Sequence, residues 1–201
     1  MIEAIFSIAI LIMSVVIHEV SHGLVAYWLG DPTAKYAGRL TLNPVSHLDP
    51  IGSLLLPAAS YFLGGFIIGY AKPVPYNPYN LSNQRWGPAL VGAAGPASNI
   101  LAALAFSVII RFFGPNFSPA LLEILSAIVL INIILAIFNL VPIPPLDGSK
   151  VLFAFLPYDS HNIQVMMEQY GLFLLLVFIF FIWQYLFPVV EFAFRLFVGA
   201  I

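Results

Sequence analysis

The chain has 201 residues, of which 61% are hydrophobic and only 8% are charged, and its formal net charge is -2. A mean hydropathy of +0.99 lies outside the soluble range and indicates an integral membrane protein. The small negative charge and the lack of a basic run argue against a nucleic-acid partner. The chain has no cysteine, which excludes disulfides and thiolate metal sites, so a bound metal would need His, Asp or Glu ligands.

Five apolar runs follow one another, at residues 4–30, 51–71, 87–110, 118–146 and 169–190. Each is long enough to cross a hydrocarbon core of about 30 Å as a helix. The stretches between them at 31–50 and 72–86 are rich in Pro, Asn and β-formers, which favours loops and a short β-hairpin at residues 34–42. We therefore expect an all-α polytopic membrane protein with about five to six transmembrane or re-entrant segments and a short hairpin and loop region near the membrane surface.

The first apolar run contains the sequence "HEVSH" at residues 18–22. On a helix, His18 and His22 lie one turn apart on the same face, with Glu19 beside them. Two neutral imidazoles can bind Zn²⁺, which makes a water molecule acidic enough for a glutamate to take its proton. Ionisable residues at membrane depth are costly and normally mark function. The motif therefore predicts a zinc site for hydrolysis.

Two histidines leave the metal short of a protein ligand, and Asp147 in "FNLVPIPPLDGSK" is the best candidate for a third. Prolines at 142, 144 and 145 forbid a regular helix before it. An opened backbone at membrane depth is tolerated only where protein buries it or where it lines a wet cavity. The alternative is an interfacial aspartate that ends a helix before Gly148.

The motifs "HEVSH", "GPASN" at 95–99 and "FNLVPIPPLDG" at 138–148 together resemble the site-2 protease family of intramembrane zinc metalloproteases. The resemblance covers residues 4–156 and is closest to a compact bacterial or archaeal branch. We treat residues 1–201 as one metalloprotease domain, with further membrane segments at about 169–201. The resemblance implies one zinc per chain with His18, His22 and Asp147 as ligands. It also implies that Glu19 is the general base and that Asn139 polarises the scissile carbonyl or stabilises its oxyanion.

The function that follows is hydrolysis of a peptide bond within or beside a transmembrane segment of a membrane-protein substrate. A helical substrate hides its carbonyls in its own hydrogen bonds, so part of it must unwind first. An edge strand at residues 33–42 could receive the unwound segment. We expect a multi-pass protein of a prokaryotic cell (inner) membrane, with its site towards the cytoplasm.

Two other classes of function fit parts of the sequence. One is a non-enzymatic divalent-metal protein or transporter, for which Glu19 would be dispensable. The other is a membrane metalloprotease that trims lipidated peptides and takes its third ligand from a downstream glutamate on a helix. Glu168 and Glu191 lack such a context, which favours Asp147.

Several further polar and aromatic positions have more than one interpretation. His47 either supports the metal ligands, acts as a gating residue, or is a loop histidine bonded to backbone. Asn99 either joins helices or lines the cleft. Small residues at 87–98 favour close helix packing near the site, whereas the aromatic run at 178–187 is typical of a lipid-facing belt.

The topology depends on residues 51–71, which either cross the membrane or enter and return on one face. Glycines and prolines in this run suit a re-entrant hairpin. With the amino terminus outside, the re-entrant arrangement places every Lys and Arg except Arg111 among residues 35–150 in the cytoplasm, as the positive-inside rule prefers. We therefore favour the re-entrant arrangement.

Overall fold

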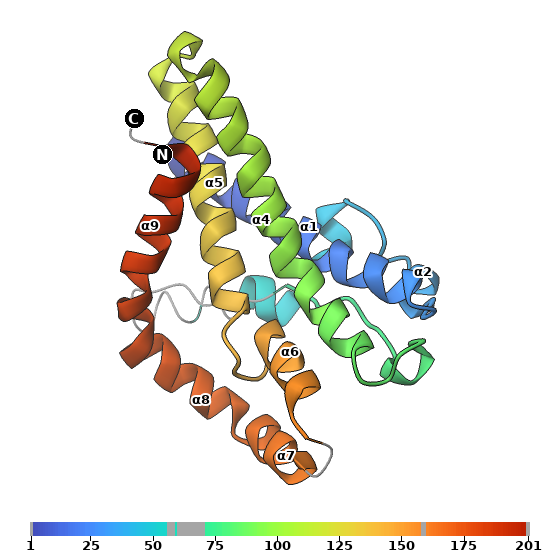
Figure 1. The fold of residues 1–201 in the computed structure, drawn as a ribbon. Helices are drawn as coiled ribbons and strands as arrows, with labels where there is room; N and C mark the ends of the chain where they lie inside the picture. The colour runs from blue at the N-terminus through green and yellow to red at the C-terminus, as the bar shows by residue number, and fades with distance from the viewer. Residues whose placement is uncertain (1, 56–58, 60–70, 158–159, 200–201) are drawn as a thin grey trace.

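The protein is described by a computed structural model, which covers residues 2–55, 59, 71–157 and 160–199. Four helical stretches in this part of the chain are long and apolar enough to cross a bilayer, namely Ile5–Trp28, Gly87–Asn116, Pro119–Asn139 and Gly171–Val198. The protein is thus an all-α, polytopic integral membrane protein, as its composition predicts (Figure 1).

The main helices are α1 (Ile2–Trp28), α2 (Thr33–Tyr36), α4 (Gly87–Phe113), α5 (Pro119–Asn139), α6 (Asp147–Phe155), α7 (His161–Gln169), α8 (Gly171–Val177) and α9 (Phe187–Val198). Shorter helical turns occupy Pro44–His47, Pro50–Leu55, Pro78–Asn80, Gly114–Asn116, Phe178–Ile182 and Trp183–Leu186. Helix α5 begins after Ser118, whose side chain accepts a hydrogen bond from Leu121 N, and it ends three residues before Pro142. The prolines thus stop the helix as the sequence predicts.

Helices α1, α4 and α5 form the core of the bundle, and α4 packs against both of the others. Leu29 O, just after α1, accepts a hydrogen bond of 2.8 Å from Ser82 N, just before α4. The carboxyl end of α1 therefore meets the amino end of α4, and the two helices run in opposite directions. Since α5 follows α4 after a short turn, α5 runs parallel to α1. The segments that carry the histidines and Asp147 thus reach the same end of the bundle.

The predicted β-hairpin at 34–42 is wrong, because the described residues contain no strand and residues 33–36 form α2. The physical reason is a local hydrogen-bonding pattern. Asp31 accepts hydrogen bonds from the backbone N and the hydroxyl of Thr33, which starts a helical turn after Pro32. The chain then reverses at Gly38, whose φ of 65° suits glycine. The predicted edge strand for substrate at 33–42 is absent with it.

Asp31 also holds the segment that precedes α4 through hydrogen bonds. Its carboxylate is fully buried and accepts hydrogen bonds from Asn77 N at 2.6 Å and from the Asn80 side chain at 2.8 Å. Burial alone would raise the pKa of Asp31, but the hydrogen bonds from Thr33, Asn80 and Asn77 outweigh burial and hold the pKa below its usual value. The carboxylate therefore stabilises the junction between α1 and α4 in its ionised form.

A buried apolar cluster joins α9 to α4 and α5, towards the end of the bundle where α4 ends and α5 begins. Its buried members are Ala103, Ile110, Leu125, Val129, Ile133, Val190 and Val198. At this end, Arg111 donates to Phe197 O at 2.6 Å and also to Leu196 O. Phe181 and Tyr185 are mostly exposed, as lipid-facing side chains would be.

The interpretation of residues 51–71 as re-entrant falls largely outside the described residues. The residues on either side of this segment lie together, since Lys72 N donates to His47 O at 2.9 Å.

Candidate metal centre

Helices α1 and α6 bring together, inside the bundle, three side chains that could hold a metal ion. Nε2 of His18 lies 3.0 Å and Nε2 of His22 lies 3.1 Å from Oδ2 of Asp147. The three ligand atoms lie within 4.8 Å of one another, and all three residues are buried. Two imidazoles and one carboxylate thus lie close together, although His18 and Asp147 are 129 residues apart in the chain.

The other ring nitrogen of each histidine has a hydrogen-bond partner. Nδ1 of His22 lies 2.6 Å from Val91 O, a carbonyl that can only accept, so Nδ1 carries the proton. Nδ1 of His18 lies 2.6 Å from Oδ1 of Asn99, and the amide nitrogen of Asn99 donates elsewhere. Both partners leave Nε2 with a free lone pair aimed at the centre. This tautomer is the one that binds a metal through Nε2.

Asn99 belongs to a buried polar network that spans three helices. Its side chain donates to Oδ1 of Asn132 in α5 at 2.8 Å, and Asn132 donates to the hydroxyl of Ser14 in α1 at 3.0 Å. Asn99 is fully buried and the other two are nearly so. Asn99 therefore both joins helices and supports the centre. Sequence reasoning missed Asn132 and Ser14, although polar residues in long apolar runs are a recognisable signal.

Close packing of α4 makes room for the two imidazoles. A Cβ at Gly95 would lie 2.5 Å from ring atoms of both His18 and His22. A Cβ at Gly92 would lie 3.0 Å from Asp147 O and from Lys150 Cβ. The predicted close packing of small residues near the site is therefore present in α4.

The irregular segment before α6 delivers Asp147 to the centre. Asp147 is the first residue of α6, and Leu146 before it is extended. A Cβ at Gly148 would lie 2.2 Å from Leu140 O, so only glycine allows α6 to fold back on the end of α5. Oδ1 of Asp147 accepts a hydrogen bond of 3.0 Å from Lys150 Nζ, which leaves Oδ2 towards the histidines. Lys150 is a site neighbour that sequence reasoning missed.

The structure places Glu19 beside the cluster and gives Asn139 a local partner. Glu19 is half-buried, and its Oε2 accepts a hydrogen bond of 2.8 Å from Val74 N in the extended segment before α4. Asn139 is also half-buried, and its amide donates to Leu135 O in its own helix at 2.9 Å. None of the hydrogen bonds among the described residues joins Asn139 to the three-residue cluster.

His47 is not one of the three clustered residues and is almost completely buried. Its Nε2 lies 2.9 Å from Thr41 O, which is the backbone-bonded arrangement of an ordinary loop histidine.

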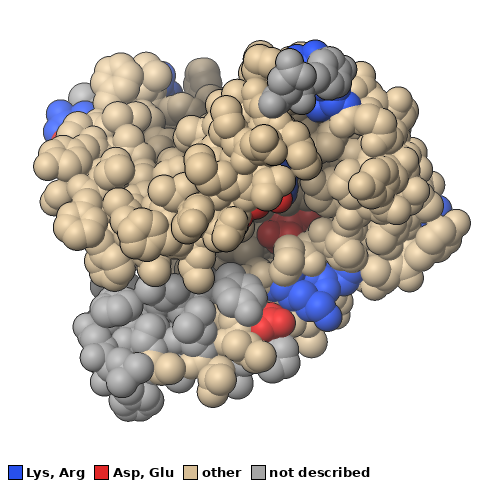
Figure 2. Space-filling model, turned by 90° about the horizontal axis from the view of Figure 1, so that it is seen from below, with Lys and Arg blue, Asp and Glu red and all other residues tan. Residues whose placement is uncertain are grey.

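A cavity of about 850 Å³ opens beside the centre. Ser149 and Lys150, which follow Asp147 directly, form part of its wall. Figure 2 views the molecule from below relative to Figure 1 and shows acidic atoms at the bottom of a hollow, with basic side chains nearby. The centre is therefore buried in the bundle but lies next to an open cavity that both apolar and polar side chains line.

Comparison with known proteins yields a family and several relatives. The model of the family described as "Peptidase family M50" matches residues 114–182. The chain is 39% identical over 174 residues to a Bacillus subtilis protein named "Putative zinc metalloprotease YwhC", which covers 83% of this chain and 76% of the relative. It is 29% identical over 166 residues to "Putative zinc metalloprotease Rip2" of Mycolicibacterium smegmatis, covering 83% and 63% of the two chains.

A more distant relative is "Zinc metalloprotease MJ0392" of Methanocaldococcus jannaschii, with 27% identity over 147 residues, 73% of this chain and 33% of the relative. The chain thus spans between one third and three quarters of the lengths of these relatives. No solved structure matches the chain.

Proposed function

Since the chain belongs to peptidase family M50, the site-2 protease family of zinc metalloproteases, we propose that it is an intramembrane endopeptidase that cleaves membrane-protein substrates. The scissile bond lies within or beside a transmembrane segment of the substrate. The observation that carries this proposal is the buried cluster of His18, His22 and Asp147 inside an apolar bundle.

The donor set fits zinc on chemical and steric grounds. Two neutral imidazoles and one carboxylate are ligands that zinc prefers in catalytic sites with an open position. Nδ1–H of each histidine donates to Asn99 or Val91, which leaves both Nε2 atoms unprotonated, and glycine at 95 leaves space at the ring edges. In this proposal His18, His22 and Asp147 hold one zinc per chain. When bound, zinc supplies Lewis acidity, which makes a water molecule more acidic and a peptide carbonyl more electrophilic.

The remaining residues bind, orient and move a proton. Glu19 takes the proton of the attacking water on its carboxylate and passes it to the leaving amine. Val74 N donates to Oε2 of Glu19, so in this proposal Oε1 is the oxygen that takes the proton. Lys150 holds Oδ1 of Asp147 and keeps the carboxylate in one orientation. Asn139 stays a candidate for contact with the scissile carbonyl, which would require its amide to leave Leu135 O.

A transmembrane substrate must unwind before attack, because a helix occupies each carbonyl with its own hydrogen bond. The cavity beside Lys150 has polar side chains among its apolar ones, and these give an unwound segment partners for its freed backbone groups. The site faces the cytoplasm of a prokaryotic cell in this proposal, because most of the basic residues lie at the same end of the bundle.

The proposal is tested with purified protein in liposomes and a model substrate that has one transmembrane segment. We expect cleavage inside or beside that segment, loss of cleavage with a zinc chelator, and recovery when zinc is added back. Mass spectrometry of the products locates the cut. Zinc-dependent cleavage confined to soluble peptides, or zinc binding without any cleavage, would contradict the proposal and favour the trimming protease or the non-enzymatic metal protein.

A further inference from the structure

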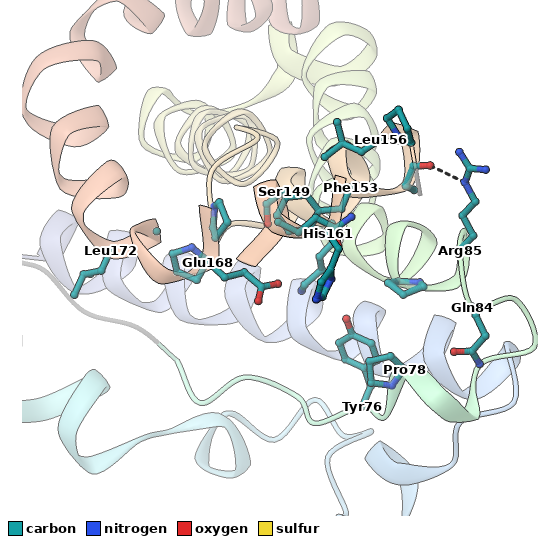
Figure 3. Close-up of a pocket in the computed structure, with 18 residues that line it drawn as sticks. Tyr76, Pro78, Gln84, Arg85, Ser149, Phe153, Leu156, His161, Glu168 and Leu172 are labelled. Atoms are coloured by element: carbon teal, nitrogen blue, oxygen red, sulfur yellow. Dashed lines mark hydrogen bonds between the residues drawn. The ribbon is translucent and has the colours of Figure 1, made fainter. Parts of the chain in front are cut away.

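The cavity beside the metal centre has walls from three parts of the chain. Tyr76 and Arg85 lie on the segment before α4, Phe153 lies on α6, and Glu168 and Leu172 lie on α7 and α8 (Figure 3). Its volume of about 850 Å³ is in the range of pockets that enclose a drug-sized ligand. Lys150 connects it to the centre, because this side chain lines the cavity and also bonds to Asp147.

Two of the cavity's cationic side chains already have partners. Arg85 Nε donates to Ala154 O at 3.1 Å, and its guanidinium lies 5.9 Å from the centroid of the Trp86 ring. Lys150 Nζ lies 3.0 Å from Oδ1 of Asp147. His161 is exposed at the start of α7.

Glu168, an acidic residue of the cavity wall, has no such partner in the part of the chain that the structure describes. Among the described residues no hydrogen bond or ion pair involves its carboxylate, which Figure 3 shows pointing into the cavity. It lies in the last turn of α7, where the negative end of the helix dipole disfavours a carboxylate. An exposed acid in an unfavourable place, aimed into a cavity next to a metal centre, suits a binding role.

The chemistry of the occupant follows from the side of the membrane. Five of the seven Lys and Arg residues lie at the end of the bundle where α1 ends and α4 begins, which marks that end as cytoplasmic. Transmembrane segments of other proteins follow the same rule and carry Lys or Arg on their cytoplasmic flank. A substrate that reaches the centre from this end therefore presents a basic flank to the cavity.

Helix geometry sets the spacing between that flank and the cut. His18 lies ten residues before the end of α1, which corresponds to a depth of about 15 Å along the helix. An extended peptide covers about 15 Å in four or five residues.

We propose that the cavity binds the basic cytoplasmic flank of a membrane-protein substrate, with Glu168 pairing to a Lys or Arg about four or five residues from the scissile bond. This inference rests on the proposed function for the identity of the occupant. It adds a charge preference that the metal centre does not dictate.

The test measures binding separately from cleavage. The Glu19→Gln variant, in a zwitterionic detergent, is titrated with fluorescent peptides that share one Leu/Ala transmembrane segment and carry a Lys-Lys, Gln-Gln or Glu-Glu flank. We expect the Lys-Lys peptide to bind about three- to tenfold more tightly than the Glu-Glu peptide, as for one partly exposed charge pair. Adding Glu168→Gln should abolish most of this preference, and adding Glu168→Lys should reverse it.

Glu123→Lys is the matched control, because Glu123 is also exposed but lies in the first turns of α5, at the other end of the bundle. It should leave the preference unchanged. Equal binding of the three peptides, tighter binding of the Glu-Glu peptide, or a preference that survives Glu168→Lys would overturn the inference. If the preference is present but the wild type cleaves none of the peptides, the proposed function fails and the binding site stands.

Discussion

Ser14, Asn99 and Asn132 place polar atoms in the middle of a bundle that has no polar solvent around it. Each side chain has a hydrogen-bond partner within the network, so the cost of burial is offset. The network ends at Nδ1 of His18. Its consequence is that one tautomer and one ring orientation are set before a metal binds.

The first prediction concerns Asn99. Asn99→Ala removes the acceptor for His18 Nδ1, so the ring can rotate or change tautomer, and zinc affinity should fall about 10- to 100-fold. Competition with a chelator of known affinity measures this. Ser107→Ala is the control, because Ser107 is buried in the same helix and bonds only to Leu104 O among the described residues. An unchanged zinc affinity in Asn99→Ala would show that the network serves helix packing alone.

The second prediction concerns Asp31 and pH. Its folded-state pKa is lowered from 3.8, so its ionised form stabilises the fold above about pH 4, and this contribution is lost as pH falls below 3.8. Asp31→Asn should lower the free energy of unfolding by about 1–3 kcal/mol at pH 7. The reason is that the side-chain NH₂ of the new asparagine can face Asn77 N, which is itself a donor. The melting temperatures of wild type and Asp31→Asn are measured by thermal unfolding in detergent at a series of pH values.

The difference in melting temperature between wild type and Asp31→Asn should shrink as the pH drops below 4. Glu123→Gln, an exposed acid replaced by its amide, should show no such difference. A constant difference across the pH series would contradict the role assigned to the ionised carboxylate.

Among the elements, α4 sets the geometry of the centre, because it packs against the helices on both sides of it. Its glycines permit this approach, and the third prediction tests one of them. Gly95→Ala puts a Cβ 2.5 Å from both imidazoles, so the rings must move and zinc binding should be lost while helix content is kept. Zinc content and circular dichroism measure the two effects.

Gly114→Ala is the control on the same segment, since its Cβ would meet nothing closer than Leu122 Cδ2 at 3.4 Å and its φ is helical. It should bind zinc like the wild type. Full zinc occupancy in Gly95→Ala would mean that α4 lies farther from α1 than described here.

The elements also show what sequence reasoning can reach. Apolar runs predicted the four described spans, and prolines 142, 144 and 145 predicted the irregular segment before Asp147. The hairpin at 34–42 was wrong because β-forming residues there were outweighed by the hydrogen bonds of Asp31. Local patterns carry such information only over a few residues.

Contacts between distant segments were out of reach for the same reason. His18 and His22 could be paired from their spacing, but Asn132 joins Ser14 across 118 residues. Val74 reaches Glu19 across 55 residues. Each apolar run has several faces, and the sequence alone does not say which face meets which helix.

For the whole molecule, charge and connectivity indicate one orientation in the membrane. Lys35, Arg39, Lys72, Arg85 and Lys150 belong to the end where α1 finishes and α4 starts, whereas Arg111 and Arg195 lie towards the other end. The positive-inside rule predicts that the first end is the cytoplasmic one.

The fourth prediction tests this orientation. Single cysteines at Lys35 and Asn83, in a chain that has none, should both react with an impermeant thiol reagent only from the cytoplasmic face. A cysteine at Asn116, after α4, should react only from the other face. Labelling of positions 35 and 83 from opposite faces would show that residues 51–71 cross the membrane.

The central claim is that Glu19 is the general base of a zinc-dependent hydrolysis and is not a ligand of the metal. Glu19→Gln keeps the size of the side chain and its acceptor for Val74 N but removes the base. The decisive measurement compares zinc content and cleavage of a model transmembrane substrate in wild type and Glu19→Gln. The account predicts unchanged zinc content and a loss of cleavage of at least about 100-fold in Glu19→Gln. Normal turnover by this variant, with zinc bound, would contradict the account.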